Sequence, residues 1–274
     1  YVVGPQIKLA KRLSKLLPDN LQSFYFLNSG SEAVEGAMKL AKKHTGRGKI
    51  VAMRNAYHGS TSGALSMMSD EYYSGPFKPL LPNIHFAELN ELATLDIIDN
   101  QTAAVFIEPI QSEKGYIPVT QIFLNALRTK CNETGTLLIF DEIQSGIGRT
   151  GKLYAFEHYN VVPDILLSAK ALGGGMPIGV FISSKEIMDN LSDNPILGHI
   201  TTFGGHPVSC AAGNAALKFL TKSNLMNEVA EKEALFRELL VHPKIKGLSG
   251  KGLMLAVQLD SFEEVERTMK RCIE

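Results

Sequence analysis

The chain has 274 residues, of which 45% are hydrophobic and 20% charged, and its 28 basic and 28 acidic side chains leave no net charge. This composition is typical of a globular protein and excludes intrinsic disorder, collagen and a long coiled coil. A neutral chain also lacks the basic field that would hold a nucleic-acid backbone or an anionic membrane, and its length allows one large α/β domain or two small ones.

Three scattered cysteines, Cys131, Cys210 and Cys272, show no Cys-x-x-Cys spacing. They predict neither a disulfide scaffold nor a structural zinc site, and they favour a reducing compartment, the cytoplasm. We find no run of about 18 apolar residues and no signal-peptide pattern, so we expect neither secretion nor a membrane span. The start without Met and the amphipathic pattern that runs into 271–274 suggest a piece of a longer protein.

In chain order, a helical pattern from Ile7 to Leu17 stops at Pro18, and short apolar runs then alternate with helical patterns. Strands are expected at 24–27, 50–53, 84–87, 103–107, 137–140, 165–167, 178–182 and 253–259, and helices at 31–44, 89–98, 121–133, 207–220 and 225–240. This alternation predicts an α/β protein with a mostly parallel sheet covered on both faces. Ligands of such sheets gather at the carboxyl ends of the strands.

Residues 28–32, Asn-Ser-Gly-Ser-Glu, join an expected strand to an expected helix. Small residues and free amides at a helix start can hold an anion such as phosphate. The alternative is an ordinary helix cap, with Ser31 as the capping residue and Glu32 placed favourably in the helix dipole.

Asp141 and Glu142 stand at the exit of an apolar strand, where an acid commonly faces a pocket. No further ligands at suitable spacing accompany them, so no metal site is predicted. A carboxylate that holds a protonated nitrogen of a ligand is the preferred interpretation. An aspartate that caps a loop is the alternative.

Lys170 ends a second apolar run and is followed by three glycines, at 173–175. Burying an ammonium costs on the order of several kcal/mol, so a lysine inside a core is usually paired or reactive, and a desolvated amine attacks carbonyls. The glycines leave room for a flat ring. A lysine that reaches solvent before a turn is the alternative.

Residues 146–151, Gly-Ile-Gly-Arg-Thr-Gly, match the dinucleotide fingerprint literally. The glycines do not follow their strand directly, and residues 152–160 show little helical patterning, so we expect a loop.

Tyr57 and His58 follow another strand and offer an aromatic face and an imidazole, or else belong to the core. One cofactor, pyridoxal phosphate, needs a Schiff-base lysine, an acid on its pyridine nitrogen, an aromatic face and a phosphate cradle. The combination of motifs therefore predicts a pyridoxal-phosphate site.

On these residues the chain resembles the class III aminotransferases of fold type I, and among them the acetylornithine, ornithine and 4-aminobutyrate aminotransferases. The resemblance covers nearly the whole chain and is most specific at 140–151, 163–165 and 168–175. It implies a pyridoxal-phosphate-binding large domain at 1–243, with a mostly parallel seven-stranded sheet and helices on both faces. The start of a truncated small domain is expected at 244–274.

The resemblance also implies roles for single residues around the cofactor ring. Lys170 is similar to the lysine that forms the Schiff base and later moves the proton. Asp141 resembles the acid that keeps the pyridine nitrogen protonated. Gln144 corresponds to the residue beside the phenolic oxygen, and Tyr57 to the ring that stacks on the cofactor.

Four further residues are assigned in the same way. Gly30 and Ser31 resemble the phosphate-binding turn, and Thr202 resembles the threonine that reaches the phosphate of the neighbouring subunit, which implies a homodimer. Glu113 resembles the catalytic gate acid that neutralises a substrate-binding arginine in one half-reaction.

The chain departs from the family pattern in ways that affect the substrate. Ser60 stands where acetylornithine-type enzymes usually have an arginine that grips a carboxylate, and this pattern is more similar to amine:pyruvate transaminases. His206 stands where an asparagine is common. The arginine expected to pair with Glu113 would lie beyond residue 274, and the N-terminal segment that shapes the substrate entrance is missing.

The resemblance implies a ping-pong aminotransferase that moves a terminal amino group from an ω-amino acid to a 2-oxo acid. An amine:pyruvate transaminase, or an aminomutase or lyase on the same scaffold, is the nearest alternative. A nicotinamide oxidoreductase built on residues 146–151 and a non-catalytic binding module are more distant ones.

Overall fold

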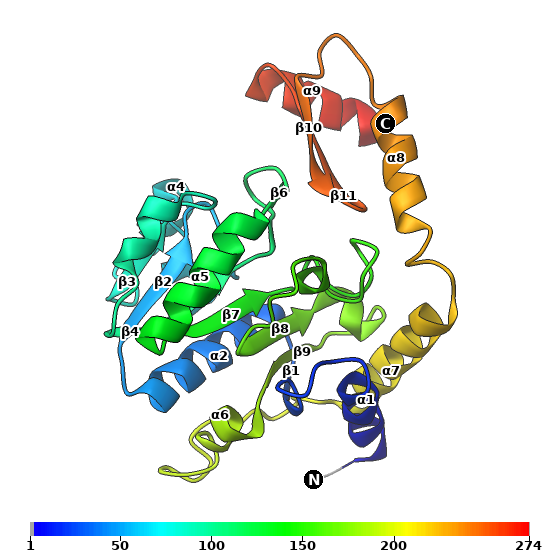
Figure 1. The fold of residues 1–274 in the computed structure, drawn as a ribbon. Coiled ribbons are helices and arrows are strands. Elements are labelled where there is room, and N and C mark those ends of the chain that lie inside the picture. The colour runs from blue at the N-terminus through cyan, green and yellow to red at the C-terminus, as the bar shows by residue number, and fades with distance from the viewer. Residues whose placement is uncertain (1–2, 274) are drawn as a thin grey trace.

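A seven-stranded sheet forms the centre of the computed structural model, which describes residues 3–273 (Figure 1). Its strand order is β1-β9-β8-β7-β4-β2-β3. The strands are β1 (Ser23–Leu27), β2 (Lys49–Met53), β3 (Ile84–Ala87), β4 (Thr102–Ile107), β7 (Leu137–Asp141), β8 (Ile165–Ala169) and β9 (Gly179–Ser183). From β3 to β8 all neighbours are parallel, and β9 runs antiparallel to both β8 and β1. The mostly parallel sheet predicted from the sequence is confirmed.

Helices cover both faces of this sheet, as predicted. In β4, Val105 and Ile107 join one hydrophobic core and Ala104 and Phe106 the other, because successive side chains of a strand point to opposite faces. The first core includes side chains of α1 (Gly4–Ser14), α5 (Gln121–Thr134) and α7 (Pro207–Lys222), and the second those of α2 (Gly30–Thr45), α3 (Ser62–Ser66) and α6 (Lys185–Asp189). Strands buried on both sides need continuous apolar runs, which is why the sequence reveals them.

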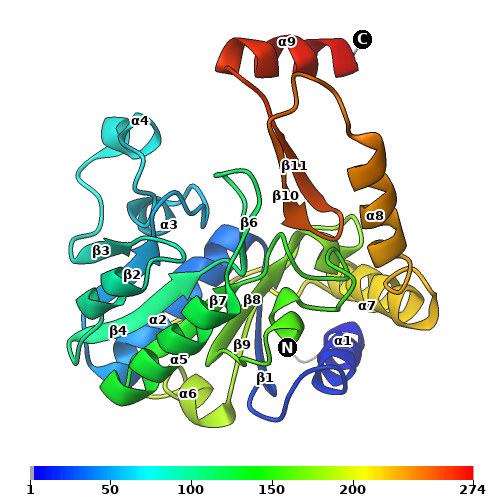
Figure 2. The same ribbon diagram turned by 45° about the horizontal axis from the view of Figure 1, so that its top comes forward.

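A smaller group of elements stands apart from the sheet (Figures 1 and 2). It comprises α8 (Val229–Leu239), the hairpin of β10 (Gly247–Lys251) and β11 (Met254–Gln258), and α9 (Phe262–Ile273). The Ser249 hydroxyl in β10 donates to the Gly115 carbonyl in the turn between β5 (Ile110–Gln111) and β6 (Ile117–Pro118). Among the described residues, no helix is both long and apolar enough to cross a membrane.

Several elements differ from the prediction. The helix expected at 89–98 is instead a 3-10 helix, η2 (Leu92–Ile97). Asn90 has a φ of +69° and ties its side chain to Pro118 and Thr120, so an α-helix cannot begin at 89. The sequence did not reveal β5, β6 or β10, nor the short helices α3, α4 (Glu71–Ser74) and α6, nor η1 (Gly75–Phe77), η3 (Ala155–His158) and η4 (Lys170–Gly173).

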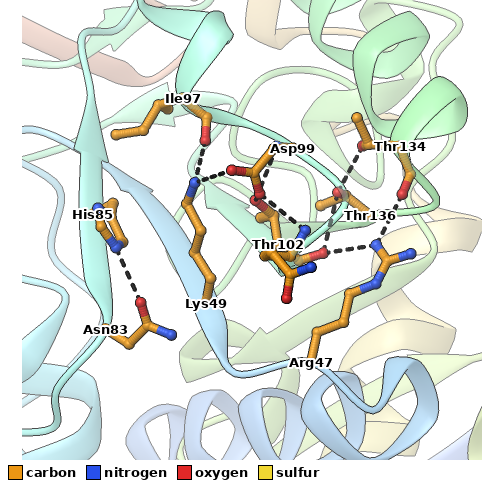
Figure 3. A network of polar contacts seen from close by, with 10 residues as sticks. Arg47, Lys49, Asn83, His85, Ile97, Asp99, Thr102, Thr134 and Thr136 are labelled. Atoms are coloured by element: carbon orange, nitrogen blue, oxygen red, sulfur yellow. Dashed lines mark hydrogen bonds and ion pairs between the residues drawn. The ribbon is translucent and has the colours of Figure 1, made fainter.

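A polar network ties together the amino ends of the parallel strands (Figure 3). Lys49, at the start of β2, lies 2.8 Å from Asp99, and this hydrogen bond is the main cause that lowers the pKa of Asp99 to about 2. Arg47 donates to the carbonyls of Thr102 and Thr134 at 3.0 and 2.8 Å. Hydrogen bonds therefore hold the amino ends of these strands together. The pocket of the candidate site lies at the opposite edge of the sheet, where the strands have their carboxyl ends.

Candidate active site

The carboxyl ends of four neighbouring strands bring the predicted site residues together. The register pairs Ile107 of β4 with Phe140 of β7, and Asp141 with Leu167 of β8. The residues that follow these strands therefore meet at one edge, as expected for parallel strands. They line a cavity of about 290 Å³, to which Gly30, Ser31, Tyr57, His58, Glu108, Asp141, Gln144 and Lys170 all contribute.

Asp141 lines this cavity and is paired with a histidine. The distance between Asp141 Oδ2 and His58 Nδ1 is 2.8 Å, and both side chains are almost completely buried. Asp141 Oδ1 accepts a hydrogen bond from the backbone N–H of Ile143 at 3.1 Å. Asp141 thus faces the pocket, and the alternative in which it only caps a loop does not account for this pair.

The pair also affects the charge of His58. Burial alone would lower the pKa of His58, but the hydrogen bond and the negative charge of Asp141, helped by Glu108, raise it above the ordinary value. His58 Nε2 is buried and has no hydrogen-bond partner within residues 3–273. The hydrogen bond from His58 therefore holds the Asp141 carboxylate from the side away from solvent.

Lys170 lines the same cavity but is not buried. It directly follows β8 and is exposed, so the expectation of a desolvated lysine inside the core is wrong for the described chain. The apolar run ends one residue earlier, at Ala169, and the chain then turns outward into η4. Lys170 has a φ of +45°, a backbone conformation that is strained for a residue with a Cβ and that is found preferentially at functional sites.

The amino end of α2 forms another wall of the cavity. Ser29, not Ser31, is the capping residue, because its side chain accepts a hydrogen bond from the N–H of Glu32. Ser31 is therefore free of the capping role and its hydroxyl faces Gly59, where any Cβ would collide with it and where φ is +126°. The start of α2 thus presents exposed backbone amides to the cavity, which is the arrangement that binds anions.

The remaining predicted residues fall into two groups. Tyr57 and Gln144 are half-buried and line the cavity, and the Tyr57 hydroxyl lies 3.1 Å from the hydroxyl of Ser60. Glu113, in the turn between β5 and β6, and Thr202, in the segment before α7, are exposed and do not line it. The roles of these two residues stay predictions.

Glu142 follows Asp141 but has a different function. Its carboxylate is fully buried and accepts hydrogen bonds from the backbone N–H groups of Ala155 and Phe156, at 2.6 and 2.7 Å, and from the Ser145 hydroxyl at 2.8 Å. It organises the loop at 142–154. Burial raises the pKa of Glu142 to about 7, against the lowering effect of these donors.

The glycine-rich stretch 146–151 is a loop, as predicted, and opens no α-helix. A Cβ at Gly148 would press on Leu220 and Met226, and one at Gly151 would contact Val229. These glycines serve the packing of the loop against the start of α8 and the end of α7.

Two features of the cavity are not predicted from the sequence. The sequence offers His58 as an imidazole or a core residue without a partner, and nothing in it singles out Glu108. The strand register holds the missing signal, because Glu108 directly follows Ile107 and so comes to lie beside Asp141. His206, noted as unusual, caps α7 by accepting from the Val208 N–H, a role that asparagine also fills.

Residues 2–274 match the family model described as aminotransferase class-III. A LysW-aminoadipate semialdehyde/glutamate semialdehyde transaminase of Sulfolobus acidocaldarius is 44% identical over 257 residues, which make up 92% of this chain and 66% of that protein. An acetylornithine aminotransferase of Methanopyrus kandleri is 39% identical over 97% of this chain and 68% of its own length. The chain thus spans about two thirds of the length of these curated relatives.

Solved structures agree with this similarity. The ornithine aminotransferase from Toxoplasma gondii matches with a TM-score of 0.87 and 32% identity, over 95% of this chain and 64% of that one. An amine transaminase from an uncultivated Pseudomonas species, solved with pyridoxal phosphate bound, matches with a TM-score of 0.88 and 28% identity, over 96% of this chain and 68% of that one.

The burial of Glu142 predicts a pH-dependent stability. A carboxyl whose folded pKa is raised stabilises the fold fully below its unfolded pKa of about 4.3, and this contribution is lost as the pH rises through the folded value. Glu142→Gln should therefore remove part of the fall in unfolding free energy between pH 4.5 and 7.5, a slope of at most about 1.4 kcal/mol per pH unit. Urea unfolding at several pH values measures it.

Glu186→Gln, at an exposed position on α6, is the matched control and should leave the profile of the wild type unchanged. If the profiles of Glu142→Gln and the wild type run parallel over this range, Glu142 is not the buried titrating group.

Proposed function

The chain belongs to the class-III aminotransferase family, and on this basis we propose that it is a pyridoxal-phosphate-dependent transaminase. It moves a terminal amino group from an ω-amino acid or amine to a 2-oxo acid. The observation that carries the proposal is the convergence of Lys170, Asp141 and the amino end of α2 on one cavity.

The residues of the cavity fit this cofactor. The α2 amides at Gly30 and Ser31 suit its phosphate, the buried Asp141 suits a protonated ring nitrogen, and Tyr57 offers an aromatic face. Lys170 is the one lining side chain with an amine. When bound, pyridoxal phosphate supplies a carbonyl that condenses with amines and a ring that accepts electrons.

Different residues of the chain then hold and move the protons. Asp141 holds the proton on the ring nitrogen, because its charge sits in a buried site where an ion pair is strong. His58 stabilises that charge from behind through the 2.8 Å hydrogen bond. Lys170 is exposed and lines the cavity, and its amine is the group that would move the proton of the substrate Cα.

The cavity offers few cationic side chains that could bind a substrate carboxylate, and this constrains the substrate. Among its described lining residues, Lys170 is the only lysine or arginine, and Ser60 occupies the position of the expected arginine. We propose an ω-amino acid such as acetylornithine, ornithine or 4-aminobutyrate as the donor, and the first two are named in the relatives. The exposed Ser60 favours an amine:pyruvate-type activity as the second candidate. An aminomutase or lyase would use the same cavity.

We also propose a homodimer in which Thr202 reaches the cofactor of the other subunit. Thr202 lies in a segment that exposes Ile196, Leu197, Ile200 and Phe203, each with between 66% and 78% of its surface accessible. An apolar segment of this kind suits a protein interface. We further propose a large domain at 1–243, the start of a small domain at 244–274, and a cytoplasmic location, which suits three free thiols.

Asp141→Asn should lower turnover by at least about 10²-fold, because the ring nitrogen loses its charge partner. Binding of pyridoxal phosphate should survive, since the helix amides and Lys170 remain. Steady-state kinetics and a fluorescence titration with the cofactor measure the two effects. Asp19→Asn, at an exposed position, is the control. Full turnover in Asp141→Asn would contradict the role of this carboxylate.

Donor and acceptor profiling tests the substrate class. We expect transfer from acetylornithine, ornithine, 4-aminobutyrate or a simple amine to pyruvate or 2-oxoglutarate, with the new amino acid identified as product. Ser60→Arg should lower the KM for a donor that carries an α-carboxylate, because it supplies a bidentate partner. Gln101→Arg, at an exposed position just before β4 at the opposite edge of the sheet, serves as the control.

Two results would refute this assignment. The proposed reaction is wrong if no donor yields an aminated acceptor, and it is an aminomutase or lyase if the amino group moves within the donor or leaves as ammonia. An unchanged KM in Ser60→Arg would show that the carboxylate is not held near this position.

A further inference from the structure

Glu108 is a buried carboxylate on the wall of the cavity to which the proposed function gives no task. It directly follows β4 and has only 6% of its surface exposed. A buried carboxylate is costly unless donors surround it, so its partners show what it does.

Three donors from two separate segments converge on this side chain. Glu108 Oε2 accepts from the backbone N–H of Tyr57 at 3.2 Å. Glu108 Oε1 accepts from the backbone N–H and from the hydroxyl of Ser112, at 3.2 and 2.7 Å. One carboxylate therefore connects the segment that follows β2 with the strand pair β5 and β6.

The two connected segments are the ones that carry predicted functional side chains. Tyr57 bears the aromatic face, and Ser112 immediately precedes Glu113. A second hydrogen bond connects the same two segments, because Gln111 Nε2 donates to the carbonyl of Arg54 at 2.7 Å. Within residues 3–273, the hydrogen bond to Glu108 is the one that holds the backbone N–H of Tyr57 itself.

We propose that Glu108 is a positioning residue, whose ionised carboxylate clamps the Tyr57 backbone to Ser112 and so sets the aromatic wall of the cavity. This inference rests on the proposed function, since it assigns Glu108 a part in orienting the cofactor ring.

The clamp needs an ionised carboxylate, because two of its three partners are backbone amides that can only donate. A proton on Glu108 has only the Ser112 hydroxyl to bond to, so protonation weakens the clamp. Burial raises the pKa of Glu108 to about 7, the charge of His58 lowers it and that of Asp141 raises it. The titratable groups that share the cavity with Glu108 are Tyr57, His58, Asp141 and Lys170.

The substitution Glu108→Gln keeps the shape of the side chain but replaces one acceptor oxygen with a donor, which leaves one backbone amide unpaired. Amide hydrogen exchange of the purified protein without cofactor should be faster at Tyr57 or Ser112 by about tenfold or more, corresponding to a lost hydrogen bond of about 1.4 kcal/mol.

In the protein loaded with pyridoxal phosphate, the same variant should change the visible circular dichroism of the bound cofactor, which reports the orientation of its ring. We expect kcat to fall about tenfold or more with little change in KM, because misplacement of reacting groups slows the chemical step. Between pH 6 and 8 the dichroism of the wild type should change and that of Glu108→Gln should not.

Two further variants keep the test decisive. Ser112→Ala removes only the hydroxyl donor and should give a smaller change in the same direction, so it decides the matter if Glu108→Gln does not fold. Glu186→Gln, on the surface of α6, should match the wild type.

Exchange rates and dichroism that are the same in the wild type, Glu108→Gln and Ser112→Ala would overturn the inference. A wild type that binds no pyridoxal phosphate would refute the proposed function alone. The exchange experiment, which uses the protein without cofactor, shows separately whether Glu108 holds Tyr57 and Ser112 together.

Discussion

The parallel register of β2, β4, β7 and β8 is the constraint on which the site depends. Parallel neighbours end at the same edge of a sheet, so the residues after them are brought together although they are far apart in sequence. In this chain they are Asp141, the last residue of β7, and His58, Glu108 and Lys170, which follow β2, β4 and β8. The hydrogen-bonded network at the opposite edge holds the amino ends of the strands and so supports the register.

Three acidic side chains at this edge have different tasks because their donors differ. Asp141 is paired with an imidazole and opens into the cavity, Glu108 accepts from two segments of the wall, and Glu142 accepts from the amides of η3 on the far side. Burial is common to all three, and the partner decides whether the charge serves a ligand or the fold. The same edge therefore combines a binding carboxylate with two carboxylates that organise its surroundings.

The sequence predicts those parts of the fold that are encoded by local patterns. The strand expected at 84–87 has the same bounds in the structure, because Ile84 and Phe86 favour a strand and follow the turn residues Pro82 and Asn83. β10 reads Gly-Leu-Ser-Gly-Lys and is a strand only through its pairing with β11, which no local pattern reveals. For the site, Asp141 and Lys170 stand out as polar residues at the ends of apolar strands. The His58 partnership and the exposure of Lys170 depend on register and on the turn into η4, and so lie beyond sequence patterns.

The most direct measurement is to reduce the protein with borohydride in the presence of pyridoxal phosphate and to map the modified peptide by mass spectrometry. We expect a phosphopyridoxyl group on Lys170 at a stoichiometry near one per chain, and its loss in Lys170→Ala. A label on any other lysine, or none under conditions where the protein is folded, would contradict the central claim that this amine faces a pyridoxal-phosphate site.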